Sequence, residues 1–233
     1  SNRSACHSSS SSLPNQSIKS EALKGPATAS GYAQGDICCI RESTATPIEH
    51  ILAAHPAIHE NPRLLKKCED ALRRIKAEGS MLGKERPCIL LCTIPSGVRT
   101  APTVCLMGTF GGTPFEELSE IFKMFCIPLY PNLGQDGSVP VHSTPEWPSS
   151  EDQWIIAYSF ESSRFIKGHW RLGSDRRLGI SAGSTDVLVC RLDADAQAFL
   201  REQSAMKMKE WEERTSRDPN LAVRCALEFR AVR

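Results

Sequence analysis

Two short apolar segments in the middle of the chain carry side chains suited to binding an anion. Residues 88–94 and 103–110 are bounded by glycine or proline and are too short for stable helices, so we predict buried strands. Lys84 and Arg86 precede the first strand, and Thr109 lies at the end of the second. Pairing of the strands as a hairpin would bring these cations and this hydroxyl to one anion site.

A second stretch, residues 164–171, interleaves cations with aromatic rings. Cations contact phosphates and aromatic faces stack on unpaired bases, so this stretch is the best candidate for contact with single-stranded RNA. The alternative is a half-solvated strand whose Phe165 and Trp170 are anchored in the core. The predicted RNA-binding residues are Lys84, Arg164, Lys167, Trp170, Arg171, Arg176 and Arg177.

Three other patterns give weaker indications of chemistry. Residues 179–183 match G-x-S-x-G, but a hydrolase would need a strand before them, a helix after them and a later histidine, and the last histidine is His169. His55 and His59 would share a helix face, but an intervening proline interrupts the helix and no further ligands complete a metal site. The glycine-rich residues 108–113 either cradle a phosphate or form a flexible turn between a strand and a helix.

The elements that would position these residues are short strands with helices inserted between them. This pattern favours an α+β fold, with a small, mostly antiparallel SH3-like barrel or curved sheet, over a doubly wound sheet. We predict strands over residues 32–42, 88–94, 103–110, 126–130, 154–160 and 186–192. Helices are predicted from Thr46 to before Pro56, from Asn61 to Gly79, from Thr113 to about Phe125, and from Asp193 to about Arg214. Residues 221–229 fit a final strand slightly better than a helix.

Composition and length suggest one main domain with flanking segments. Residues 1–30 are serine-rich and predicted to be a disordered tail, residues 31–215 form the domain with a helical insertion at 46–79, and residues 216–233 are an extension. Residues 131–152 form a long loop that is either functional or mobile. The net charge of +1 argues against a protein that coats polyanions over its whole surface.

The sequence also indicates the compartment. No apolar run approaches the roughly 20 residues needed to cross a bilayer, and the start lacks a secretory signal, so we expect a cytoplasmic protein without membrane contact. The ten cysteines form no C-x-x-C pair and mostly lie in apolar runs, so they are expected to be reduced core residues.

Three segments resemble, in order, the MazF/PemK/Kid family of toxin ribonucleases from toxin–antitoxin pairs. Residues 35–37, Gly-Asp-Ile, are similar to the opening of that family's first strand. Residues 86–91 resemble its arginine-proline signature entering a strand, and residues 103–109 resemble the next core strand, which ends in a hydroxyl residue. The long helix after Asp193 is similar in placement to the family's C-terminal helix.

The resemblance implies an SH3-like homodimer that cleaves single-stranded RNA without a metal or any other cofactor, and that an inhibitory protein partner controls. Carried over by position, Arg86 and Thr109 become the catalytic pair. A guanidinium donates bidentate hydrogen bonds to phosphate oxygens, and a hydroxyl donates to the same oxyanion. Arginine is a poor general base, so His169 is a further candidate to carry the proton.

The chain departs from that family in one region that bears on function. Residues 43–85 insert two predicted helices where the family has an RNA-contacting loop, so sequence preference cannot be transferred. Loss of activity would leave a non-catalytic SH3-like module that binds nucleic acid or protein. A small-molecule enzyme that uses residues 108–113 is a third alternative, but no complete cofactor motif supports it.

Overall fold

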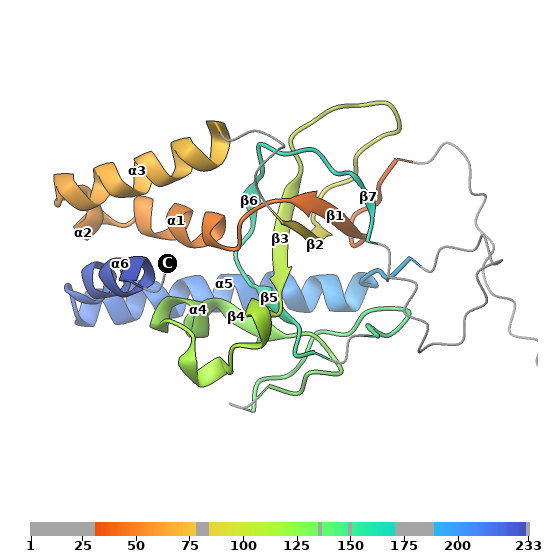
Figure 1. Cartoon of the computed structure of the whole chain (residues 1–233). Helices are drawn as coiled ribbons and strands as arrows, with labels where there is room; N and C mark the ends of the chain where they lie inside the picture. The colour runs from red at the N-terminus through yellow and green to blue at the C-terminus, as the bar shows by residue number, and fades with distance from the viewer. Residues whose placement is uncertain (1–30, 78–83, 135–136, 149–150, 171–188, 232–233) are drawn as a thin grey trace, which may run out of the picture. The chain divides into compact units, whose positions relative to one another are not determined.

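An antiparallel sheet with β3 at its centre organises the computed structural model (Figure 1), which describes residues 31–77, 84–134, 137–148, 151–170 and 189–231. The strand order is β4-β5-β3-β2-β1-β7, and β6 also pairs with β3. The strands are β1 (Ile37–Arg41), β2 (Glu85–Leu90), β3 (Thr103–Gly108), β4 (Cys126–Pro128), β5 (Trp154–Ile156), β6 (Phe160–Glu161) and β7 (Gly168–His169). The pairings between these named strands are all antiparallel.

The described helices lie between the strands and after the last of them. They are α1 (Ala45–Ala53), α2 (Pro56–His59), α3 (Pro62–Ala77), the 3-10 turns η2 (Phe110–Gly112) and η3 (Phe115–Glu117), α4 (Glu120–Phe125), α5 (Ala194–Arg217) and α6 (Leu221–Ala231). The described helices are each too short or too polar to span a bilayer. The α+β class, the mostly antiparallel sheet and the long helix near the C-terminus are confirmed, whereas the described strands form an open sheet and do not close into a barrel.

Each face of the sheet carries its own core, because successive side chains of a strand point to opposite faces. Ile40 and Leu106 belong to the larger cluster, which α1, α3, α4 and α6 also supply. Ile89 and Met107 belong to the second cluster. α5 reaches both, with Leu200 in the second cluster and Trp211 in the larger one, and Figure 1 shows it running the length of the sheet region.

Several element boundaries differ from the predictions because tertiary partners replace local ones. The Thr46 hydroxyl donates to the Glu42 carboxylate at 2.8 Å rather than capping a helix. The helix predicted from Thr113 is replaced by η3 and the six-residue α4, and Thr113 donates its hydroxyl to the Phe110 carbonyl. The predicted strand 154–160 is divided into β5 and β6, which pair with different parts of β3.

Other predictions match the structure closely. Asp193 caps α5, and its Oδ1 accepts a hydrogen bond from the Ala196 amide at 2.8 Å. α3 begins at Pro62, and the Asn61 side chain accepts from the Leu64 amide. The strand favoured for residues 221–229 is wrong, because this segment is α6, whose buried residues join the larger core.

Candidate functional site

A buried carboxylate at the entrance to β1 forms the centre of the candidate site. Asp36 is 2% exposed and follows a tight turn in which its Oδ2 accepts from the Ala33 amide at 2.9 Å. Gly35 makes this turn at a φ of 90°, and a Cβ there would clash with the side-chain amide of Gln197 and the backbone carbonyl of Leu192. The turn therefore needs glycine directly before the carboxylate.

The edge strand β7 brings a histidine to this carboxylate. β7 pairs with β1, and the partner of Cys38 in this pairing is His169. The His169 Nε2 atom lies 3.1 Å from Asp36 Oδ2. An ionised carboxylate only accepts hydrogen bonds, so Nε2 carries the proton and Nδ1 is the acceptor of the neutral ring. The imidazole is 30% exposed, which leaves it accessible to a substrate.

Two further side chains complete what we call the Asp36 site: Asp36, His169, Arg191 and Tyr32. The backbone of Arg191 forms a bridge with Asp36, and its Nη2 lies 3.3 Å from Asp36 Oδ1. The guanidinium is 57% exposed, so a second anion can reach it. The edge of the Tyr32 ring packs against His169, with ring centroids 5.3 Å apart.

The electrostatics of the Asp36 site keep its carboxylate ionised. Burial acts to raise the pKa of Asp36, but the hydrogen bonds from His169 and the Ala33 amide and the charge of Arg191 outweigh burial and lower it. Burial, followed by the nearby Cys38, raises the pKa of Tyr32, so that hydroxyl retains its proton. The site therefore combines a fixed negative charge, an oriented imidazole and an accessible cation.

The predicted pair Arg86 and Thr109 lies elsewhere in the sheet. The β2–β3 register brings both residues to the same end of that strand pair. Strand alternation directs Arg86 to the face of Cys88, whereas Thr109 lies beyond the end of β3, in helical backbone directly before η2. The Arg86 Nε donates to the Glu42 carbonyl at 3.1 Å, and burial lowers the pKa of its guanidinium. Their assignment as a catalytic pair stays a prediction.

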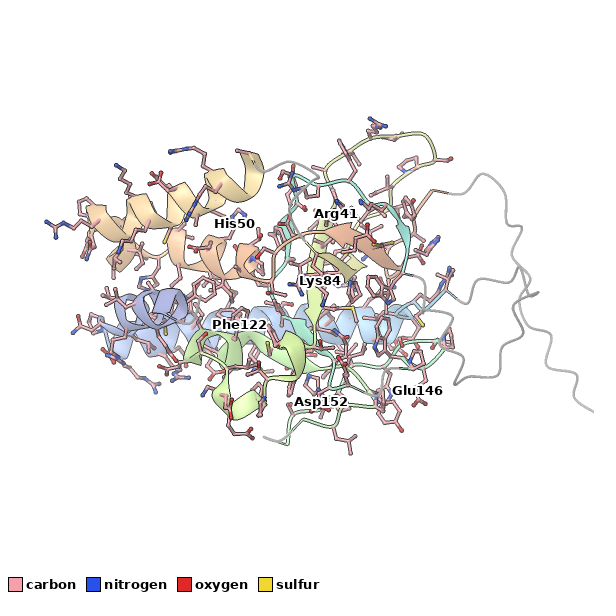
Figure 2. The ribbon with its side chains drawn as sticks, viewed as in Figure 1. Arg41, His50, Lys84, Phe122, Glu146 and Asp152 are labelled. Atoms are coloured by element: carbon pink, nitrogen blue, oxygen red, sulfur yellow. The ribbon has the colours of Figure 1, made fainter. Side chains whose placement is uncertain are left out.

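The predicted RNA-binding residues that are described lie around β7 and the start of β2. The exposed Lys167 forms an ion pair with Glu85 at 2.9 Å, and Arg41 contacts the same carboxylate at 3.4 Å. Lys84, exposed directly before β2, and Arg41 on β1 are labelled in Figure 2. Trp170 is half-buried against the second core, as the core-anchored alternative expects, whereas Phe165 is 53% exposed and departs from it.

The remaining candidates can be placed as follows. Arg164 is half-buried, and its amide donates to the Ser162 hydroxyl at 3.0 Å. Arg171, Arg176, Arg177 and the G-x-S-x-G segment lie outside the described residues. The 108–113 segment forms η2 and is not followed directly by an α-helix, so it lacks the helix N-terminus that a phosphate cradle would use.

Within the described residues, no three histidine, cysteine or carboxylate side chains come together in a group that could hold a metal ion. His55 serves instead as the N-cap of α2, where its Nδ1 accepts from the Ala57 amide at 3.2 Å.

The sequence suggested His169 as a candidate but gave no role to Asp36, Arg191 or Tyr32. Asp36 and His169 are 133 residues apart, and no spacing rule connects them. The glycine-aspartate turn is the only local signal, and it indicates a strand entrance rather than a histidine partner. No protein-family model, curated protein or solved structure matches the chain.

Proposed function

We propose that this protein is a metal-independent endoribonuclease that cleaves single-stranded RNA, with His169 as its general base. The observation that carries the proposal is that one buried carboxylate, Asp36, holds a half-exposed imidazole and an exposed guanidinium side by side. RNA transesterification needs both functions: a group that accepts the 2′-hydroxyl proton, and a cation for the charge that develops on phosphorus.

The chemistry assigns one role to each side chain. His169 Nδ1 removes the proton from the 2′-hydroxyl, the 2′-oxygen forms a bond to phosphorus, and the bond from phosphorus to the 5′-oxygen breaks. The proton then passes from His169 to the 5′-oxygen, which leaves a 2′,3′-cyclic phosphate and a 5′-hydroxyl. Asp36 fixes the tautomer and stabilises the imidazolium, and Arg191 binds the phosphate oxygens.

The surroundings supply contacts for the rest of the strand. Lys167 precedes His169 by two residues on the same segment, and its ammonium is shared with Glu85 rather than buried. Phe165 is 53% exposed, and the Arg99 guanidinium lies 5.8 Å from the centre of its ring. Exposed aromatic faces and cations of this kind suit unpaired bases and phosphates. The SH3-like relationship, the homodimer and the inhibitory partner stay predictions of the resemblance.

The test uses the full chain and a fluorescent 12-nucleotide RNA in the presence of EDTA. We expect fragments that end in 2′,3′-cyclic phosphate, identified by mass spectrometry, and no cleavage of the all-deoxy strand, which lacks the attacking hydroxyl. His169→Ala is expected to lower the rate by about 10²–10⁴-fold. His59→Ala, a change at an exposed histidine on α2, is the matched control and should cleave normally.

Two results would overturn the proposal: RNA that stays intact with the wild-type protein, or equal cleavage by His169→Ala.

Binding without turnover is the second candidate function, and the exposed Phe165–Arg99 pair favours it. A gel-shift assay on the same RNA separates the two functions, because binding alone gives a salt-dependent complex with intact RNA.

A further inference from the structure

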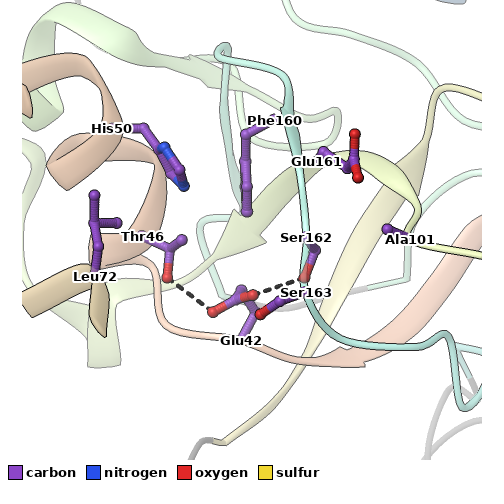
Figure 3. A pocket seen from close by; sticks show the side chains of 9 residues that line it. All are labelled: Glu42, Thr46, His50, Leu72, Ala101, Phe160, Glu161, Ser162 and Ser163. Atoms are coloured by element: carbon purple, nitrogen blue, oxygen red, sulfur yellow. Dashed lines mark hydrogen bonds between the residues drawn. The ribbon is translucent and has the colours of Figure 1, made fainter. Parts of the chain in front are cut away.

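A pocket between α1 and the β6 segment lies outside the Asp36 site. It has a volume of about 250 Å³, and its lining includes Glu42, Thr46, His50, Phe160, Glu161 and Ser162. Figure 3 shows His50 and Phe160 on one side of it and the Glu42 carboxylate on the other. We call it the Glu42 pocket. Its volume is below that of most drug-sized sites and suits a single small ring system.

The Glu42 carboxylate has one acceptor position left for a ligand. Its Oε1 accepts from the Thr46 hydroxyl at 2.8 Å and from the Ser43 amide at 3.1 Å. Its Oε2 accepts from the Ser162 hydroxyl at 2.7 Å. A carboxylate offers about four lone-pair positions, so these three donors leave one, on Oε2. A ligand that meets this oxygen must therefore supply a donor.

The opposite side of the Glu42 pocket presents two rings. The centroids of His50 and Phe160 are 5.6 Å apart, and their planes are tilted by 30°. Burial is the main influence on His50 and lowers its pKa, so the ring is neutral near pH 7. A neutral imidazole presents one donor and one acceptor, and the Phe160 ring offers an apolar face.

The charge of the lining selects against a phosphate. Among the described side chains that line the pocket, Glu42 and Glu161 are carboxylates and none is a lysine or an arginine. A neutral flat ligand with an amino group fits this combination. The pairing edges of adenine and cytosine each present an amine beside an unprotonated ring nitrogen. Uracil presents a carbonyl in place of that amine.

We propose that the Glu42 pocket binds one adenine or cytosine base of the RNA. Glu42 Oε2 accepts from the exocyclic amine, and the His50 N–H donates to the adjacent ring nitrogen. This inference rests on the proposed function, since the base belongs to the RNA strand that is cleaved. Phe160 in the pocket and His169 in the Asp36 site lie on one continuous segment. His169 is nine residues further along the chain than Phe160, a separation of at most about 30 Å, so a single RNA strand can reach both places.

The test is a titration of the isotopically labelled full chain with adenosine, cytidine and uridine, followed by nuclear magnetic resonance of the histidine side chains. We expect saturable shifts of the His50 signals with adenosine or cytidine, and binding of uridine that is weaker by about fivefold or more. The signals of His59 should stay unchanged. Equal binding of uridine, or no shift of His50 with any nucleoside, would overturn the assignment.

Variants extend this test without removing the buried carboxylate. His50→Leu keeps an apolar side chain beside the Phe160 ring but loses the N–H donor, so we expect adenosine binding to weaken by about tenfold. His59→Leu is its matched control. The outcomes also separate the two proposals. RNA that stays intact while adenosine shifts the His50 signals rejects the endoribonuclease and supports the base-binding pocket. RNA that is cleaved while no nucleoside shifts His50 supports the endoribonuclease and rejects the pocket.

Discussion

Two buried carboxylates flank β1, one directly before it and one directly after it. Asp36 and Glu42 are each 2% exposed. A buried charge is tolerated only when donors surround it, and here the donors come from distant segments: His169 and Arg191 at Asp36, and Ser162 at Glu42. Each carboxylate therefore joins the start or the end of one strand to the segment that carries β6 and β7.

His55 gives the protein a sensitivity to mild acid. Its Nδ1 caps α2 as an acceptor, and burial lowers its pKa. The unfolded chain therefore takes up the proton more readily, so stability is full above the unfolded pKa of about 6.5 and falls as the pH drops below it. His55→Asn keeps an acceptor but cannot titrate. We expect its free energy of unfolding to fall between pH 7.5 and 5.0 by roughly 0.5–1 kcal/mol less than that of the wild type.

Urea unfolding of the wild type and His55→Asn at both pH values measures this effect. His59→Asn, on the exposed side of the same short helix, should keep the wild-type dependence on pH. If His55→Asn loses as much stability in acid as the wild type does, the cap is not the source of the sensitivity.

His169 could be suggested from the sequence because arginine is a poor general base and a histidine stands in the stretch that interleaves cations with rings; its catalytic role stays a prediction. The roles of Asp36 and Glu42 could not be predicted, because a carboxylate next to a strand is usually solvated. Only the folded chain shows that each of them also has a partner 120 residues or more away.

At the scale of the elements, α5 depends on a local cap that the sequence predicted correctly. Asp193→Ala removes the acceptor for the Ala196 amide and the negative charge at the start of the helix. We expect it to lower the free energy of unfolding by about 1 kcal/mol, measured by urea titration. Asp193→Ser keeps an acceptor and should recover most of the loss, and equal destabilisation by both variants would contradict the role of the cap.

Thr46 and Thr113, from which two helices were predicted to start, do not cap those helices. Both hydroxyls have other partners, Glu42 for Thr46 and the Phe110 carbonyl for Thr113. Element type was predictable for α3 and α5, where an end signal and a long helical segment agree. It was not predictable for α6, whose short alternating pattern fits a strand or a helix until its packing in the larger core is known.

At the scale of the whole molecule, the sheet separates two cores that share the same strands. The larger core includes Ile58 of α2, and the second includes Leu129 after β4. α5 contributes Leu200 to the second core and Trp211 to the larger one. Because the strands and α5 belong to both, neither core can come apart without disturbing the other.

We therefore expect one cooperative unfolding transition, seen equally by tryptophan fluorescence and by far-ultraviolet circular dichroism. Ile58→Ala and Leu129→Ala remove fully buried side chains from different cores, and each should lower stability by about 2–5 kcal/mol. In both variants the two probes should shift together. Separate midpoints, with one probe following one core, would contradict the coupling.

The position of α5 along the chain has a consequence during translation. Everything from β1 to β7 emerges from the ribosome before α5 does, yet both cores need residues that α5 supplies. A growing chain that ends before residue 194 therefore presents two incomplete apolar surfaces at once. Such a nascent chain is a natural client for chaperones until α5 has been synthesised and can complete both cores.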